Sequence, residues 1–184
     1  MTVTAGPNDQ RYPAVAYNAL TAEYVVGSQD YRSGSQWDVY VQRVAADGSL
    51  DGEEVLVSAE PADEAQDQPA AAYGTAEETH LVVWTDDRDG TDDVYGQFVA
   101  GGGALVGEAF VIAQASGYWE QTPAVAYDPD DDEYLVVWAR RQAPMVEDDW
   151  DIYGQRVAGD GTLLSSTLTL CAQEGDQTAP TVAY

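Results

Sequence analysis

Short runs of hydrophobic residues recur along the whole chain, and Gly, Asp, Asn or Pro residues separate them. The runs are rich in Val, Ile, Tyr and Trp, a composition typical of β-strands. Three of the links between runs, AADGSLDG, AGGGALVG and AGDGTLLS, contain Asp-Gly or Gly-Gly pairs that favour tight hairpins. No stretch shows a sustained helical period. The pattern therefore predicts an all-β fold.

Four of these runs return in a fixed order, three times, with a period of 54 to 57 residues. The first run is PAVAY at Pro13–Tyr17, PAAAY at Pro69–Tyr73, PAVAY at Pro123–Tyr127 and PTVAY at Pro180–Tyr184. The second is EYVVG at Glu23–Gly27, HLVVW at His80–Trp84 and YLVVW at Tyr134–Trp138. The third is DVYVQRV at Asp38–Val44, DVYGQFV at Asp93–Val99 and DIYGQRV at Asp151–Val157, and EVLVSA, AFVIA and TLTLCA close the repeats.

Four antiparallel strands in a repeat of this length describe a blade of a β-propeller. The first run is rich in Ala, as expected where blades converge on an axis, and the second is apolar on both faces, as expected between neighbouring blades. We predict a single propeller domain over residues 1–184, with three four-stranded blades and partial terminal strands. The repeats cover residues 10–65, 66–120 and 121–176, and residues 177–184 form an additional first strand. A β-sandwich built from hairpins is the main alternative.

The repeat P-x-V-A-Y…E-Y-L-V-V-W…D-I-Y-G-Q-R-V…D-G resembles the blade repeat of secreted or surface-displayed bacterial and archaeal β-propeller proteins. The resemblance extends from Gln10 to Tyr184. It implies an extracellular or cell-surface location and a scaffold for display or binding, and it brings no catalytic residues with it. The first repeat departs from the other two. Its alignment places Gly27 opposite Trp84 and Trp138, and Val41 opposite Gly96 and Gly154.

The charge of the chain excludes several classes of partner. Thirty-three acidic residues stand against seven basic ones, all of them Arg, which gives a formal charge of −26 at pH 7. Phosphate backbones are repelled by such a charge, so nucleic-acid binding is excluded, and anionic membrane surfaces are disfavoured. No apolar run approaches the ~20 residues of a membrane span, and the segment MTVTAGPNDQ lacks a signal-peptide core. One Cys and one His exclude a disulfide framework and conventional zinc sites.

The loop DDRDGTDD at Asp86–Asp93 is the strongest chemical candidate. Oxygen ligands at alternating positions, with a Gly that allows a sharp turn, suit Ca²⁺. The best metal ligands would be Asp87, Asp89 and Asp92, with Asp86 and Asp93 in support. The alternative is a solvated turn in a chain that is acidic everywhere. No other cofactor is predicted.

Three Trp residues outside the repeated strands are candidates for ligand binding: Trp37, Trp119 and Trp150. A Trp flanked by carboxylates can stack on a sugar ring while the carboxylates accept hydrogen bonds from its hydroxyls. The alternative, that these rings cover the ends of blades, is favoured. Residues that recur in all three repeats are interpreted as structural: Asp38, Asp93 and Asp151, the glutamines Gln42, Gln97 and Gln155, and the tyrosines of the first and third runs.

These observations favour a non-enzymatic propeller that serves as a scaffold or interaction module of a secreted or surface protein. One alternative is a lectin-like or calcium-dependent carbohydrate-binding propeller, with a glycan or protein ligand. A propeller hydrolase is the third hypothesis. The sequence also predicts an incomplete ring, because closed propellers have roughly four to eight blades. We therefore expect a head-to-tail homo-oligomer, with a six-bladed dimer favoured, or else a fragment of a longer array.

The excess of carboxylates predicts a stability that depends on salt, as in halophilic proteins. Thirty-three carboxylates on one small domain repel one another, and this repulsion is long-ranged at low ionic strength. The melting temperature should rise by several degrees between low salt and molar NaCl. Thermal melts followed by circular dichroism at several NaCl concentrations measure this, and a flat profile would contradict it.

Overall fold

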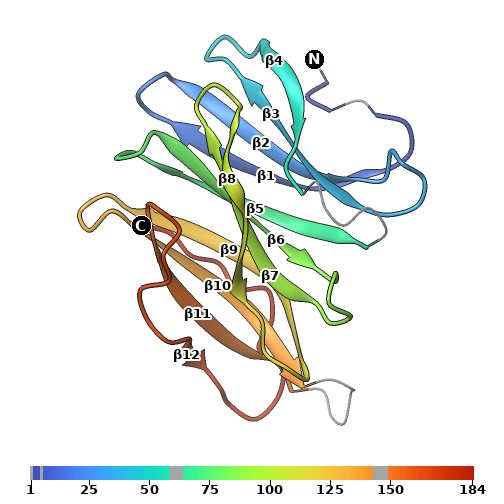
Figure 1. The fold of residues 1–184 in the computed structure, drawn as a ribbon, viewed down its shortest axis with the longest axis vertical. Coiled ribbons are helices and arrows are strands. Elements are labelled where there is room, and N and C mark those ends of the chain that lie inside the picture. The colour runs from blue at the N-terminus through green and yellow to red at the C-terminus, as the bar shows by residue number, and fades with distance from the viewer. Residues whose placement is uncertain (1, 5, 59–63, 143–148) are drawn as a thin grey trace.

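The structure, a computed structural model, describes residues 2–4, 6–58, 64–142 and 149–184 (Figure 1). These residues form twelve strands and no helix, so they include no helix long and apolar enough to cross a membrane. The strands are β1 (Gln10–Asn18), β2 (Glu23–Asp30), β3 (Asp38–Val44), β4 (Leu50–Leu56), β5 (Gln66–Gly74), β6 (Thr79–Asp86), β7 (Asp93–Ala100), β8 (Leu105–Ala113), β9 (Tyr118–Asp128), β10 (Glu133–Gln142), β11 (Asp151–Ala158) and β12 (Leu168–Cys171).

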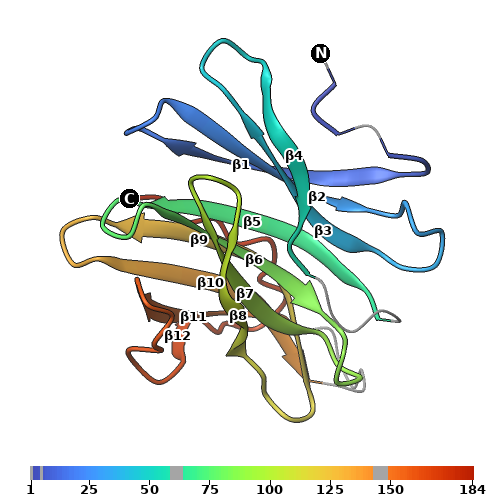
Figure 2. The ribbon, with the colours of Figure 1, turned by 45° about the horizontal axis from the view of Figure 1, so that its top comes forward.

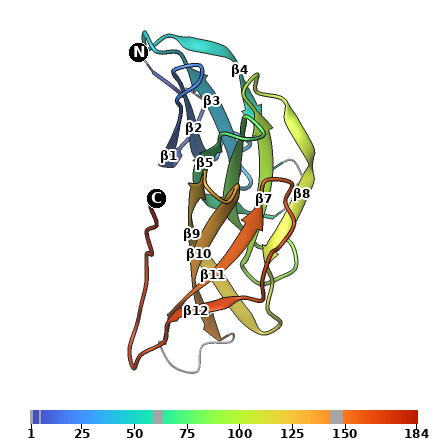
Figure 3. The ribbon, with the colours of Figure 1, turned by 90° about the vertical axis from the view of Figure 1, so that its left-hand side faces the viewer.

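The described strands make three antiparallel sheets, each built from four consecutive strands. We call β1–β4 blade 1, β5–β8 blade 2 and β9–β12 blade 3. The three blades lie next to one another, with blade 2 in the middle (Figures 1 and 2). The first strands β1, β5 and β9 follow one side of the molecule, and β8 lies on the opposite side (Figure 3). The prediction of an all-β propeller with three four-stranded blades is confirmed, and the sandwich alternative is wrong because three sheets stack in series.

Two apolar cores hold the blades together, one at each boundary between them. Val25, Val41 and Val57 of blade 1 pack against Val82 and Trp84 of blade 2. The second core joins blade 2 to blade 3, and its members include Leu81, Val83, Phe98, Ile112, Tyr134, Val136 and Trp138. Successive residues of β6 therefore serve opposite boundaries, which explains why this strand is apolar on both faces and wholly buried.

In every blade a Gly on the second or third strand faces a Val on the other of these two strands. Gly27 faces Val41 in blade 1, whereas Val83 faces Gly96 in blade 2 and Val137 faces Gly154 in blade 3. The glycine has moved from one strand to the other, and the combined volume is unchanged. This register corrects the sequence alignment, because Gly27 is equivalent to Val83 and Ser28 is equivalent to Trp84.

The residue before the Pro of each repeat has a left-handed backbone conformation. The φ angles are 49° at Tyr12, 52° at Gln68, 53° at Thr122 and 50° at Ala179. In β1, β5 and β9 this residue lies in a β-bulge. A bulge changes the direction in which neighbouring side chains point, and bulges are frequent beside functional sites.

The interpretation of the three repeated glutamines as structural is confirmed. The Nε2 of Gln97 donates hydrogen bonds to the carbonyl oxygens of Phe98 and Val106, at 3.0 and 2.9 Å. Gln42 and Gln155 make the corresponding bonds in their own blades. Each glutamine thus satisfies the carbonyl group of the next residue in its strand and a carbonyl group in the segment that follows the third strand.

Candidate functional site

We define the top face as the end of the molecule at which β1, β5 and β9 begin and at which the β2–β3 and β6–β7 loops lie. Each blade carries an Arg here, placed over the ring of its third-strand Tyr and paired with a buried carboxylate. The guanidinium carbons lie 3.8 to 4.2 Å from the ring centroids. The three sets are Asp30, Arg32 and Tyr40; Asp86, Arg88 and Tyr95; and Glu120, Arg140 and Tyr153. A threefold arrangement of this kind indicates a structural role.

Blades 2 and 3 depart from the repeat at several polar positions of the top face. In blade 2, Asp67 replaces the Arg11 and Gln121 of the other blades, and Asp92 replaces their Trp37 and Trp150. In blade 3, Glu120 replaces Gln10 and Gln66, and Arg140 replaces Asp30 and Asp86. A polar residue that only one blade carries is not required by the blade architecture. Asp67 and Asp92 are therefore the best candidates for function, whereas Glu120 and Arg140 belong to the structural Arg–Tyr set of blade 3.

Asp67 lies close to Asp92 near the start of β5. Burial, together with the charges of Asp92 and Asp87, raises the pKa of Asp67 to about 6. Asp67 is half-buried, and its Oδ1 is buried without a hydrogen-bond partner among the described residues. Asp92 accepts a hydrogen bond from the side chain of Gln121 on β9. The pair thus combines a carboxyl group with a raised pKa and a second carboxyl group that a hydrogen bond from Gln121 fixes in place.

Glu120, the neighbour of Gln121, is fully buried and anchors a second network. Its Oε1 accepts a hydrogen bond of 2.9 Å from the Nε of Arg140, and its Oε2 is buried near Asp93 without a hydrogen-bond partner among the described residues. Burial first, and then the charge of Asp93, raises the pKa of Glu120 to about 7. Asp93 also accepts a 3.0 Å hydrogen bond from Gln114. Because Glu120 is enclosed, it can position Arg140 but cannot reach a ligand.

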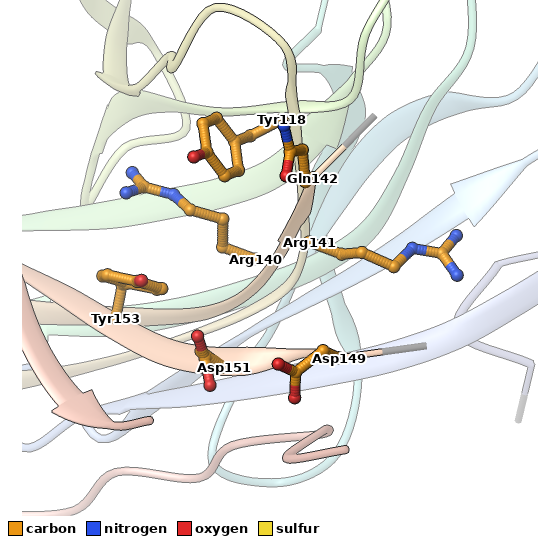
Figure 4. A pocket seen from close by; sticks show the side chains of 7 residues that line it. All are labelled: Tyr118, Arg140, Arg141, Gln142, Asp149, Asp151 and Tyr153. Carbon is orange, nitrogen blue, oxygen red and sulfur yellow. The ribbon is translucent and has the colours of Figure 1, made fainter. Parts of the chain in front are cut away.

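A pocket of about 350 Å³ opens at the top face of blade 3 (Figure 4). Its lining combines two phenol rings, two guanidinium groups, an amide and two carboxylates: Tyr118, Tyr153, Arg140, Arg141, Gln142, Asp149 and Asp151. Arg140 points between the two tyrosine rings, whereas Arg141 extends in the opposite direction (Figure 4). The pocket connects to the Asp67 pair through adjacent residues of β9, because Glu120 holds Arg140 and Gln121 holds Asp92.

The five predicted calcium ligands engage different partners in this structure. Asp86 binds Arg88 and the indole of Trp84, and Asp87 accepts a hydrogen bond from the Ala65 amide. The remaining three bind side-chain donors: Asp89 binds Tyr95 and Gln114, Asp92 binds Gln121, and Asp93 binds Gln114. No group of metal-ligating residues forms among the described residues. A calcium site stays a prediction, and it would require these carboxylates to exchange their present partners.

The three candidate tryptophans occupy two separate places. Trp119 and Trp150 both flank Arg141, whose guanidinium carbon lies 4.9 and 4.5 Å from their ring centroids. Trp37 lies on blade 1, against the ring of Tyr31 and under Arg11. Trp119 and Trp150 are thus brought together beside the pocket, and Trp37 is not part of that site.

Sequence reasoning missed Asp67, Glu120 and Arg140. A comparison of the repeats position by position would have found them, because each replaces a residue of different charge in the other blades. Their burial, however, follows from the packing of β5 and β9 and not from the sequence pattern.

The buried Glu120 predicts that stability falls as the pH rises. In the folded state the pKa of Glu120 is about 7, whereas its ordinary value is 4.5. Between these two pH values the folded state keeps a proton that the unfolded state releases. The stabilisation from this proton therefore declines as the pH rises and is lost above about 7. Glu120→Gln keeps an oxygen that can accept the hydrogen bond from Arg140, and it cannot ionise. Between pH 5 and pH 8 the wild type should lose about 2–3 kcal/mol more unfolding free energy than this variant.

Urea unfolding of both proteins at several pH values measures this difference. Asp131→Asn, in the exposed turn at the opposite end of β9 from Glu120, is the control and should follow the wild type. Equal pH slopes for Glu120→Gln and the wild type would contradict the prediction.

Comparison with known proteins supports the propeller fold and contradicts the predicted function. No protein-family model matches the sequence, and no curated protein matches it either. Among solved structures, a thermostable family-43 glycoside hydrolase matches 96% of this chain with a TM-score of 0.64 and 15% identity. An endo-arabinase from Bacteroides thetaiotaomicron matches 93% with a TM-score of 0.62 and 14% identity. An N-acetylgalactosamine deacetylase from F. plautii matches 84% with a TM-score of 0.58 and 11% identity.

The prediction of a non-enzymatic scaffold is wrong in the light of these matches, because the similar structures are glycoside hydrolases and a deacetylase. This chain spans 64% of the length of the first two and 51% of the third. At identities this low the likeness establishes the propeller fold of this chain. Its chemistry has to be argued from its own side chains.

Proposed function

We propose that this protein belongs to an enzyme that hydrolyses glycosidic bonds, with its reactive carboxyl groups at the top face. The observation that carries the proposal is the pair formed by Asp67 and Asp92. Hydrolysis of a glycosidic bond uses one carboxylic acid that protonates the leaving oxygen and a second carboxylate that acts from the other side of the sugar. The raised pKa of Asp67 and the fixed carboxylate of Asp92 match these two roles.

In this proposal Asp67 is the general acid and Asp92 is the base or nucleophile. Asp67 keeps its proton at mildly acidic pH because its burial and the neighbouring negative charges oppose ionisation. Gln121 donates a hydrogen bond to Asp92 and so directs its free oxygen. Arg140 and Glu120 do not react and serve as positioning residues, since they fix β9 against β10 and blade 2.

The pocket of blade 3 contains side chains that can bind a sugar, and β9 links this pocket to the carboxyl pair. Tyr118, which is 37% exposed, can pack on the apolar face of a pyranose or furanose ring. Asp149 and Asp151 can accept hydrogen bonds from hydroxyl groups, and Arg141 can donate them. The similar solved structures include an endo-arabinase, which supports a carbohydrate polymer as the substrate class. Such a substrate would suit the predicted extracellular location.

The test is a hydrolysis screen against arabinan, other plant polysaccharides and chromogenic glycosides. We expect activity with at least one polysaccharide, and we expect Asp67→Asn and Asp92→Asn each to reduce kcat/KM about a hundredfold. Asp131→Asn, at an exposed turn, should keep full activity. Because the acid must be protonated, kcat/KM should decline as the pH rises through about 6. Wild-type activity in both Asn variants would assign the reaction to other residues, and an inactive wild type would refute the proposal.

A further inference from the structure

Blade 1 exposes the face that the other two blades bury. Tyr17 is 49% exposed, whereas its equivalents Tyr73 and Tyr127 are each 8% exposed. Tyr24 is 41% exposed, whereas its equivalents His80 and Tyr134 are 2% and 1% exposed. Val15, two residues before Tyr17 on the same face of β1, is also exposed. An apolar aromatic surface of this kind on a sheet is typical of an interface.

The buried equivalents show what this face is shaped to contact. Tyr134 of blade 3 fills the space above Gly74 of blade 2, and its ring lies 5.9 Å from that of Phe98. The Tyr127 hydroxyl accepts a 3.3 Å hydrogen bond from the Ala76 amide of blade 2. The tyrosine face of one blade therefore packs on the aliphatic face of the preceding blade.

Blade 3 exposes an aliphatic face of the required kind. Leu170 is 49% exposed, whereas its equivalents Ile112 and Val57 are 3% and 2% exposed at the two internal boundaries. Arg156, also exposed, occupies the position of Arg43. The Nη1 of Arg43 crosses a blade boundary and donates a 3.2 Å hydrogen bond to the Gly101 carbonyl oxygen. Blade 3 thus presents the apolar residue of both internal boundaries and the Arg of the boundary between blades 1 and 2, with Arg156 here paired to Glu133.

We infer that two copies of this protein associate head to tail, with the tyrosine face of blade 1 packed on the aliphatic face of blade 3 of the other copy. Every copy exposes both the tyrosine face of blade 1 and the aliphatic face of blade 3, so a second copy can bury both faces of the first. The two contacts are identical, and the six blades of the pair fall within the range of roughly four to eight found in closed propellers. The two boundaries within one chain show the geometry of the proposed contact, because each of them joins the same two faces of neighbouring blades.

Residues 177–184 partly hold the position that the partner's β1 would take. The Gln177 amide donates a 2.6 Å hydrogen bond to the Trp150 carbonyl oxygen. The equivalent bonds at the internal boundaries join the amides of Gln66 and Glu120 to the carbonyl oxygens of Trp37 and Asp92, at 2.8 and 2.6 Å. The segment runs beside blade 3 in Figure 3 and belongs to no sheet. In the dimer the partner's β1 replaces it.

Sedimentation velocity of the full chain at micromolar concentration tests the association. We expect a mass near twice 19.8 kDa for the wild type and a monomer for Tyr24→Glu and for Leu170→Glu. Leu105→Glu places the same charge on an exposed Leu of blade 2 and should remain dimeric. A monomeric wild type, or Glu variants that dimerise as the wild type does, would overturn the inference.

Mixing the two monomeric variants tests the head-to-tail geometry. In a mixed pair both Glu substitutions fall at one contact, and the other contact is wild type. A dimer should therefore reappear when Tyr24→Glu and Leu170→Glu are combined. If the two copies used like faces, blade 1 on blade 1, mixing would restore nothing, and that result would refute the arrangement. Gln177→Pro, which removes the amide that competes for Trp150, should tighten the wild-type dimer, and a weaker dimer would refute the replacement by β1.

Discussion

Trp84→Ala should lower the free energy of unfolding by about 3–5 kcal/mol, because it empties the centre of the boundary between blades 1 and 2. Trp84 is fully buried, packs with Val25 and Val41 of blade 1, and stacks on the Tyr95 ring at 6.4 Å. Its Nε1 also donates a 2.8 Å hydrogen bond to Asp86. The substitution removes both the apolar contacts and that bond.

Urea unfolding at constant pH and salt measures this loss. Trp119→Ala is the control, since it truncates the same side chain at a partly exposed position of the top face. Its cost should be smaller by a clear margin. Equal costs for the two variants would show that the boundary core contributes less than its burial indicates.

Gly74→Ala should cost about 3 kcal/mol, the upper part of the range for overpacked sites. A Cβ at Gly74 would overlap the Tyr134 hydroxyl and lie 2.9 Å from Cζ of the same ring. The ring cannot retreat, because Tyr134 is buried and packs against Tyr127 and Phe98. Gly102→Ala is the control, since nothing lies within 4 Å of a Cβ there.

A double-mutant cycle identifies the clash as the cause. Tyr134→Phe removes the hydroxyl that the new Cβ would meet and leaves the closer approach to the ring, so it should recover part of the stability that Gly74→Ala loses. Additive costs for the two substitutions would place the strain elsewhere. Both variants can be compared by urea unfolding.

The architecture could be predicted from the sequence because each repeat contains the residues that determine its four strands. The Ala-rich first runs, the doubly apolar second runs and the hairpin links each follow from local packing, and each appears three times. The alignment of Gly27 with Trp84 was wrong by one residue. The reason is physical: a Gly–Val exchange across two strands preserves volume and is visible only once their register is known.

The candidate site was less accessible to sequence reasoning. The emphasis fell on the acidic loop Asp86–Asp93, where charge is densest, yet four of its five candidate ligands are held by neighbouring side chains and the fifth by a backbone amide. Asp67 is an isolated Asp in the sequence and gains its raised pKa from burial beside Asp92. The sequence of residues 69 to 73 predicts a strand, but it does not indicate that the neighbouring carboxyl group of Asp67 becomes buried.

The construction of every sheet from consecutive strands has a consequence for how the protein acquires its structure. Each hairpin pairs segments that are close in sequence, so blades can form with little loss of loop entropy, and the boundary cores then join neighbours only. Cooperativity in such an array passes from one blade to the next, as in other repeat proteins. Blade 2, which contributes to both cores, is therefore the one whose loss uncouples the other two, and damage to an outer blade can stay local.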